Sequence, residues 1–164
     1  VSPTLGEQFF TSAILALAGA LLAVGVVIFI RYRKLKIAIP ILITGTSEII
    51  IILGFAALIK WNLDLAAIAG ILAAVGTGVD HQIVITDEVL KGAEAMGNWK
   101  ERIKRAFFII MAAYFTTVVA MAPLLIMGAG MLKGFALTTI AGVSIGVFIT
   151  RPAFAKIIEI LLND

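Results

Sequence analysis

The sequence predicts an all-α protein, a polytopic transmembrane bundle of five helices. Of its 164 residues, 62% are hydrophobic and 14% are charged, and the mean hydropathy is +1.13. Soluble domains are only about half apolar and about a quarter charged. A helix needs about 20 apolar residues to cross a bilayer, and five segments meet that requirement. They are residues 9–30, 36–59, 65–86, 106–127 and 135–161, the last with a break expected near Pro152.

The basic residues predict the orientation of these spans. Ten of the thirteen Lys and Arg residues fall on one side of the predicted bundle, whereas Lys60 and Lys133 stand on the other. Cytoplasmic loops are enriched in Lys and Arg. We therefore expect a plasma-membrane protein with residues 1–8 outside the cytoplasm and the carboxyl end inside it. The net charge of +3 then reflects topology and not nucleic-acid binding. The ten residues are Arg31, Arg33, Lys34, Lys36, Lys91, Lys100, Arg102, Lys104, Arg105 and Lys156.

The predicted transmembrane domain covers residues 9–164 and contains one sizeable cytoplasmic linker, residues 87–105. Acidic residues come first in this linker and basic residues last. Two interpretations stay open: a short interfacial helix with Trp99 at headgroup level, or a solvated connector. The sequence starts at Val1 and not at Met, and its first residues lack the basic region of a signal peptide. We therefore expect the chain to be part of a longer protein.

The third predicted span contains Asp80, a carboxylate at membrane depth. Such a group costs several kcal/mol and usually has a function. On a helical wheel the large residues gather on one side and the small residues on the other, and Asp80 and Gly76 lie within the small arc. Membrane helices pack through small residues. We expect the small side, with Asp80, to face the bundle interior and the large side to face lipid or loosely packed neighbours. A small-xxx-small ridge runs along this arc at Ala66, Gly70, Ala74 and Gly78.

Two further charged residues are candidates for a site with Asp80. Arg151 lies at a similar depth in the fifth span, so it either pairs with Asp80 or ends its span and reaches the cytoplasmic headgroups. Glu48 follows Thr44, Thr46 and Ser47. It is either a neutral acid bonded to these hydroxyls or a second station on a proton path. His81 projects about 100° away from Asp80, so we expect it to contact the cytoplasmic loop instead.

The sequence contains no constellation that predicts an enzyme. It has no cysteine and a single histidine, so thiolate and multi-imidazole sites are excluded. It shows no nucleophile–base pair, metal cluster or phosphate loop, and Gly76-x-Gly78 lies inside a span and is not half of a dinucleotide motif. We expect no catalytic residue, metal or cofactor.

Three sequence elements resemble the SecD family of protein-export membrane proteins, in the resistance–nodulation–division (RND) superfamily. They are VSPTLGEQ at residues 1–8, GVD at 78–80 and GMLKGFALTT at 130–139. The resemblance covers essentially the whole chain and corresponds to transmembrane helices two to six, an RND-like half. It implies that a first helix and a large extracytoplasmic domain precede Val1. Bacterial members tend to carry an Asp-x-Asn where this chain has Ala112 and Tyr114, so the pattern is closer to archaeal SecD.

The resemblance implies an auxiliary subunit of the Sec export machinery. Its expected partners are SecF, the Sec channel, the preprotein substrate and the lipid bilayer, and Asp80 matches the family's proton-path residue. Two alternatives stay open. One is an RND exporter that moves small molecules or lipids, and the other is a scaffold that anchors the translocon without moving protons.

Overall fold

The structure is a computed structural model that describes residues 3–91 and 98–163. Within these ranges the chain is helical and contains no strand. The predicted all-α fold with five candidate membrane spans is confirmed, because five helical stretches are long and apolar enough to cross a membrane. The elements are α1 (Pro3–Tyr32), α2 (Leu35–Leu58), α3 (Leu65–Leu90), α4 (Trp99–Met127), α5 (Met131–Ile145), a π-helical turn (Gly146–Thr150) and α6 (Arg151–Asn163).

Several helices extend further than hydropathy predicts. Helix α1 runs from Pro3 to Tyr32, beyond the predicted residues 9–30. Helix α3 continues to Leu90 and α4 already begins at Trp99. Most of the described part of the predicted linker therefore belongs to these two helices, and Trp99 starts α4 instead of lying in a separate interfacial helix. Residues 92–97 of that linker lie outside the described part of the chain. The extensions carry charged side chains, which a hydropathy window excludes although they favour a helix as well as apolar ones do.

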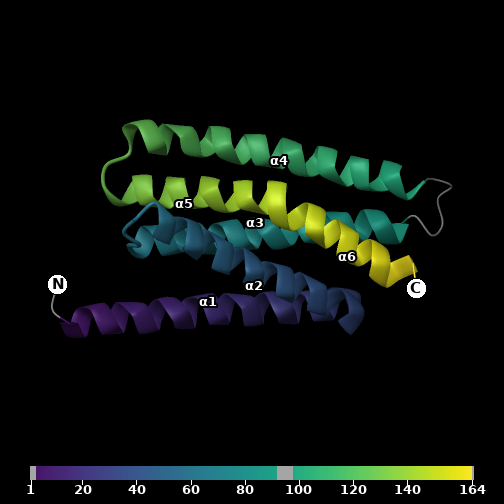
Figure 1. The fold of residues 1–164 in the computed structure, drawn as a ribbon, viewed down its shortest axis with the longest axis horizontal. Coiled ribbons are helices and arrows are strands. Elements are labelled where there is room, and N and C mark those ends of the chain that lie inside the picture. Colours follow the sequence, from purple (N-terminus) through teal and green to yellow (C-terminus); the bar gives the residue numbers. More distant parts are fainter. Residues whose placement is uncertain (1–2, 92–97, 164) are drawn as a thin grey trace.

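The helices run back and forth along the long axis of the molecule, with α3 in the middle (Figure 1). Helix α3 contacts all the other helices, and its most extensive contact is with α5. Helix α4 packs on α3 and α5, whereas α1 lies at the opposite edge beside α2 (Figure 1). The described amino and carboxyl ends lie at opposite ends of the bundle, as an odd number of spans requires.

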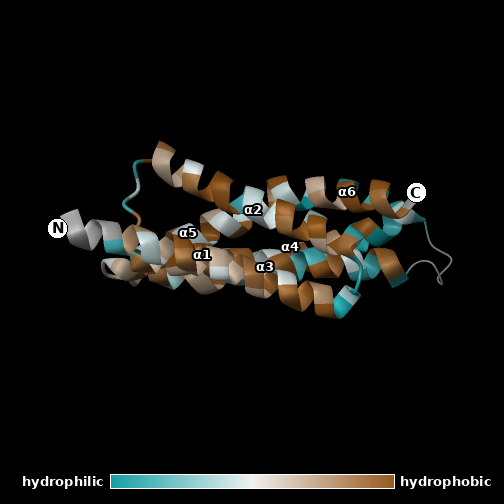
Figure 2. Cartoon of the chain, turned by 90° about the horizontal axis from the view of Figure 1, so that it is seen from below, coloured by the Kyte–Doolittle hydropathy of each residue, from teal (hydrophilic) through white to brown (hydrophobic). Residues whose placement is uncertain are grey.

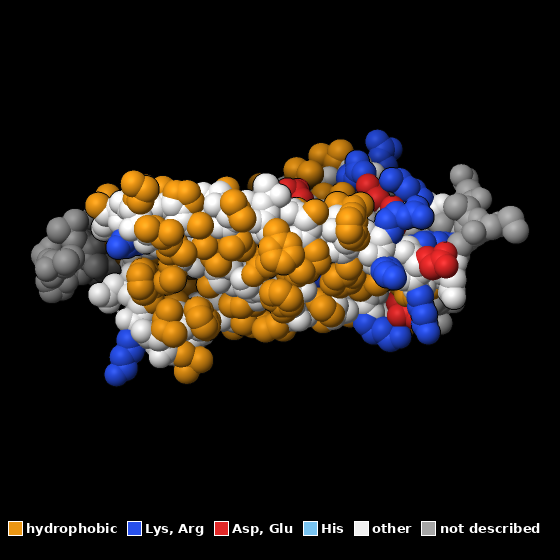
Figure 3. All heavy atoms as spheres, turned by 90° about the horizontal axis from the view of Figure 1, so that it is seen from above, with side chains coloured by type: hydrophobic (Ala, Val, Ile, Leu, Met, Phe, Trp, Pro, Cys, Tyr) orange, Lys and Arg blue, Asp and Glu red, His pale blue; other side chains and the backbone are white. Residues whose placement is uncertain are grey.

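Polar and apolar residues separate along the same axis. Hydrophobic residues cover the middle of the helices and hydrophilic residues gather toward the ends (Figure 2). Lys and Arg side chains concentrate at one end, beside a broad apolar belt (Figure 3). This is the pattern of a bundle that crosses a membrane, with its basic end at one surface.

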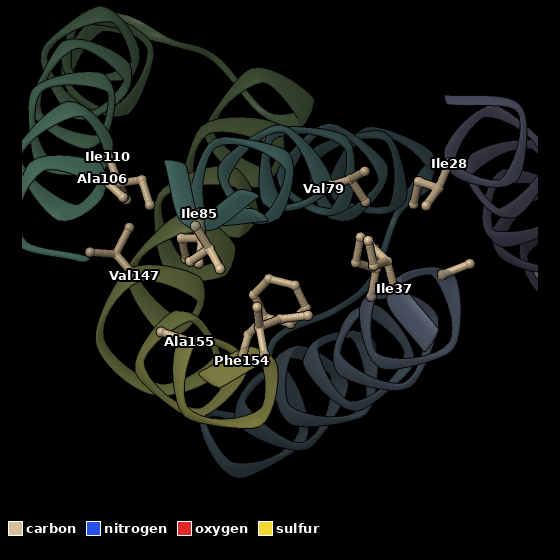
Figure 4. Packing of buried hydrophobic residues seen from close by; sticks show 13 residues of the cluster. Ile28, Ile37, Val79, Ile85, Ala106, Ile110, Val147, Phe154 and Ala155 are labelled. Carbon is tan, nitrogen blue, oxygen red and sulfur yellow. The ribbon is translucent and has the colours of Figure 1, made fainter. Parts of the chain in front are cut away.

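The main core lies in the half of the bundle nearest the basic end. Phe154 of α6 is fully buried and packs among Ile37 of α2, Val79 and Ile85 of α3, and their neighbours (Figure 4). Apolar side chains from α1 and α4, including Ile28, complete this cluster. Helix α6 is thus held against α2 and α3, and this contact positions its first residue, Arg151.

Small residues bring α3 and α5 into close contact. A Cβ atom added at Gly142 of α5 would overlap Ala74 of α3, and one at Gly70 would overlap Thr138 of α5. Thr138 also donates a hydrogen bond across the contact to the carbonyl of Ala67, at 2.9 Å. Backbones can approach this closely only where side chains are small, which is how membrane helices pack without a hydrophobic driving force.

Candidate functional site

Asp80 lies on a side of α3 that the rest of the described chain leaves uncovered. Its residue is exposed, as are Ala69, Ala73 and Gly76 on the same side. A Cβ atom at Gly76 would meet no other atom within 4 Å. The expectation that Asp80 faces the interior of this bundle is therefore wrong for the chain by itself. We call the surface formed by Ala69, Ala73, Gly76 and Asp80 the Asp80 face.

The small arc of α3 is divided between two surfaces. Gly70, Ala74 and Gly78 are buried, Ala66 is half-buried, and Gly70 and Ala74 meet α5 directly. Asp80 comes two residues after Gly78 and so points about 200° away from it. The large residues were expected to face lipid or loosely packed neighbours, but Ile71 and Val79 are buried in the core. Helix α3 is central, so the surrounding helices cover part of each arc and leave the Asp80 face open.

Arg151 forms a buried ion pair with Glu48 and not with Asp80. Its Nη1 donates to Glu48 Oε2 at 2.6 Å and its Nη2 donates to Oε1 at 3.0 Å. Both side chains are only 1% exposed. The alternative in which Arg151 reaches the headgroups is also wrong, because its charged end lies inside the bundle. This two-pronged arrangement is the strongest geometry available to a guanidinium and a carboxylate.

Thr150 completes the site around Glu48. Its hydroxyl donates to Glu48 Oε2 at 3.2 Å, and Arg151 Nη1 donates to the same hydroxyl at 2.5 Å. The expected local partners of Glu48 are engaged elsewhere, since Thr44 and Ser47 donate to backbone carbonyls of their own helix at 2.7 and 2.8 Å. Thr150 was not predicted as a site residue. The only feature of the sequence that could have indicated it is its position next to Arg151.

Two glycines make room for the guanidinium. A Cβ atom at Gly78 of α3 would overlap Arg151 Nη2, and one at Gly146 would lie 2.9 Å from both Arg151 Nη2 and Glu48 Oε1. The π-helical turn ends at Thr150, so Arg151 is the first residue of α6. The ion pair thus joins α2 to α6 and touches α3 at Gly78, two residues before Asp80.

His81 and Gln82 face inward beside this site. His81 is 4% exposed and Gln82 is fully buried, so the expected contact of His81 with the cytoplasmic loop is wrong. Toward the basic end, Asp87 accepts hydrogen bonds from Arg31 at 2.5 Å and from the Tyr32 hydroxyl at 2.6 Å. These bonds tie α3 to the end of α1, a contact that the charge pattern of the sequence did not indicate.

The chemistry available to this arrangement is limited and specific. Within the described residues no group of three or more His, Cys, Asp or Glu side chains could hold a metal ion. Glu48 and Arg151 balance each other's charge inside the bundle. Asp80 instead presents a carboxyl group on an open face, where it can exchange a proton or accept hydrogen bonds from a neighbouring helix.

Comparison with known proteins identifies the family. Residues 1–161 match the family described as "Protein export membrane protein SecD/SecF, C-terminal". The protein-export membrane protein SecD of Methanocaldococcus jannaschii is 63% identical over 159 residues, which cover 97% of this chain and 40% of that protein. SecD of Haloferax volcanii is 46% identical, over 100% of this chain and 32% of that protein. The protein translocase subunit SecDF of Brucella abortus is 31% identical, over 92% of this chain and 20% of that protein.

A solved structure confirms the fold. The crystal structure of SecDF from Thermus thermophilus, a translocon-associated membrane protein, superimposes with a TM-score of 0.83 at 24% sequence identity. The match covers 99% of this chain and 23% of that one. The chain thus spans less than half the length of the relatives it matches. The predicted resemblance is confirmed, and the chain belongs to the SecD/SecF C-terminal family of protein-export membrane proteins.

Proposed function

We propose that this chain is the membrane part of an auxiliary subunit of the Sec export machinery, which acts with SecF and the Sec channel on preproteins. Family membership supports the export role, and the relatives include proteins named SecD and SecDF. The single observation that carries the site is the exposure of Asp80 at membrane depth. An acidic side chain at the centre of a membrane helix costs about 3 kcal/mol. We therefore assign the Asp80 face to contact with a second helical bundle, that of SecF.

We further propose that Asp80 takes up and releases protons during export. Removal of water favours the neutral form of a carboxyl group, whereas a nearby cation favours the charged form. Packing of a partner on the Asp80 face and protonation of Asp80 would then depend on each other. In this proposal the amino end of the chain lies outside the cytoplasm, and the basic end of the bundle lies at the cytoplasmic surface of the plasma membrane.

Replacing Asp80 with Asn in the full-length complex is expected to remove the part of export that depends on the proton gradient. The reason is that an amide, unlike a carboxyl group, does not take up or release a proton at physiological pH. Export of a preprotein is measured with the gradient intact and after its dissipation. Glu101→Gln makes the same chemical change at an exposed position in the first turn of α4 and should leave export unchanged. Export by Asp80→Asn that is normal and still responds to the gradient would exclude the proton role and favour a scaffold.

Replacing Gly76 with Leu is expected to block assembly with SecF and to leave the chain folded. A Cβ atom added at Gly76 meets nothing within 4 Å in this chain, but a leucine side chain there would stand in the way of a helix packed on the Asp80 face. Gly54→Leu in α2 is a matched control, since a Cβ there also has open space. The readout is copurification of SecF with the tagged full-length protein. Equal recovery of SecF with the Gly76 and Gly54 variants would show that the partner binds elsewhere.

A further inference from the structure

Helices α1 and α2 form an open apolar groove on the outside of the bundle. Its volume is about 510 Å³, and its lining comes from both helices. The side chains on its rim are strongly exposed, with Leu22 at 72%, Val26 at 58% and Leu35 at 61%. Gly25 and Ala38, which carry little or no side chain, lie between these rims. The groove can therefore accept a flexible apolar chain that lies along the two helices.

A cluster of cations stands at one end of this groove. The turn that joins α1 to α2 holds Arg33 and Lys34, and Lys36 follows in the first turn of α2. All three residues are exposed. Phe29 and Leu35, which line the groove, are their near neighbours in the chain. One end of the apolar groove therefore lies next to the positively charged turn between α1 and α2.

These cations have no acidic counterpart nearby in the sequence. Residues 8–47 contain no Asp or Glu. Arg31 is engaged by Asp87 of α3, whereas Arg33, Lys34 and Lys36 form no ion pair within the described part of the chain. Basic clusters at the membrane surface attract anionic lipid headgroups, and basic pockets between transmembrane helices bind them.

We propose that the α1–α2 groove is a binding site for an anionic phospholipid. One acyl chain lies against Leu22, Val26 and their neighbours, and the phosphate contacts Arg33, Lys34 and Lys36. The stretch from Leu22 to Ile30 spans about 12 Å at about 1.5 Å per residue, which accommodates the headgroup-proximal part of an acyl chain. The site is distinct from the Asp80 face, which is on α3, and does not depend on proton transport.

The test places a fluorescent reporter in the groove of the full-length protein with its partner subunit. Leu22→Trp is introduced, and the added fluorescence relative to the parent protein is followed in nanodiscs of phosphatidylcholine with a fixed minor fraction of phosphatidylglycerol. Acyl chains carrying bromine quench tryptophan on contact, and they are supplied on one lipid or the other at the same mole fraction. Val119→Trp on α4, an exposed position at 70%, reports contact with bulk lipid.

We expect brominated phosphatidylglycerol to quench the Leu22→Trp reporter several-fold more than brominated phosphatidylcholine, with near parity for Val119→Trp. The triple change Arg33→Gln, Lys34→Gln and Lys36→Gln should abolish that preference and weaken retention of the anionic lipid by about a hundredfold. The matched triple change Lys91→Gln, Lys100→Gln and Lys104→Gln removes the same charge at exposed positions near the end of α3 and the start of α4 and should leave the preference intact.

Three results would overturn the proposal. Equal quenching of the Leu22→Trp reporter by both lipids would mean that the groove has no headgroup preference. An equal loss of preference in both triple variants would assign the effect to general surface charge. Weak quenching of the Leu22→Trp reporter by both brominated lipids, with normal quenching of Val119→Trp, would show that a protein segment covers the groove.

Discussion

Replacing Arg151 with Met is expected to destabilise the bundle by about 3–5 kcal/mol, because it leaves the Glu48 carboxylate buried without its cation. The Arg151 side chain is only 1% exposed, and its two terminal nitrogens donate to both oxygens of Glu48. The loss should also loosen the junction between α2 and α6. The measurement is the free energy of unfolding of the full-length protein in detergent micelles, followed by the loss of helical circular dichroism.

A double variant separates the ion pair from packing. Glu48→Met combined with Arg151→Met fills similar volume without a buried charge, and such replacements are often neutral or stabilising. We expect the double variant to recover most of the stability that Arg151→Met loses. Lys156→Met removes the exposed pair of Lys156 with Glu159 and should change stability by less than about 1 kcal/mol. A double variant as unstable as the single one would show that Arg151 acts through its packing and not through its charge.

Replacing Gly70 with Leu is expected to separate α3 from α5 and to cost about 3 kcal/mol or more, at the upper end of overpacking effects. A Cβ atom at this position already overlaps the Thr138 hydroxyl and lies 2.6 Å from the carbonyl oxygen of Phe135. The Phe135 carbonyl belongs to the backbone of α5, and the short Thr138 side chain is held by its hydrogen bond to the Ala67 carbonyl at 2.9 Å, so neither can move away freely. Thr139, which donates to the Gly70 carbonyl at 3.4 Å, would be displaced as well.

Gly76→Leu is the natural comparison for Gly70→Leu, since both glycines lie in α3 and gain the same side chain. The yield of monodisperse protein and the midpoint of thermal unfolding should fall sharply for Gly70→Leu and stay near the parent values for Gly76→Leu. Comparable stability of the two variants would contradict the packing of α3 on α5 described above. Gly70→Ala should lie between them, because its single methyl group meets the same two contacts.

The sequence predicted the number and position of the spans because hydropathy reflects the membrane thickness directly. It missed the ends of α3 and α4 because both helices continue into water through charged residues. Glu88 near the end of α3 bonds to Arg105 of α4 at 3.4 Å, so contacts between helices stabilise those ends. Hydropathy contains no information on such contacts.

The site was only partly predictable for a different reason. The small residues and the depth of Asp80, Arg151 and Glu48 can be derived from helical geometry, and all three stand out as charges inside apolar segments. Their pairing depends on the rotation of each helix about its axis. Depth alone indicated Asp80 as the partner of Arg151, and Glu48 was not considered for this role. Arg151 is the first residue of α6, directly after the π-helical turn, and no residue pattern in Gly146–Thr150 indicated that turn.

The π-helical turn also explains the spacing of buried residues along the last span. From Thr138 to Ile158 every fourth residue is buried: Thr138, Gly142, Gly146, Thr150, Phe154 and Ile158. A regular helix has about 3.6 residues per turn, so a strict interval of four advances by about 40° at each step and soon leaves the side that faces the core. The wider turn at Gly146–Thr150 slows this advance midway. This short irregularity thus corrects the phase of the helix, so that one span keeps its buried side against α2 and α3 along its length.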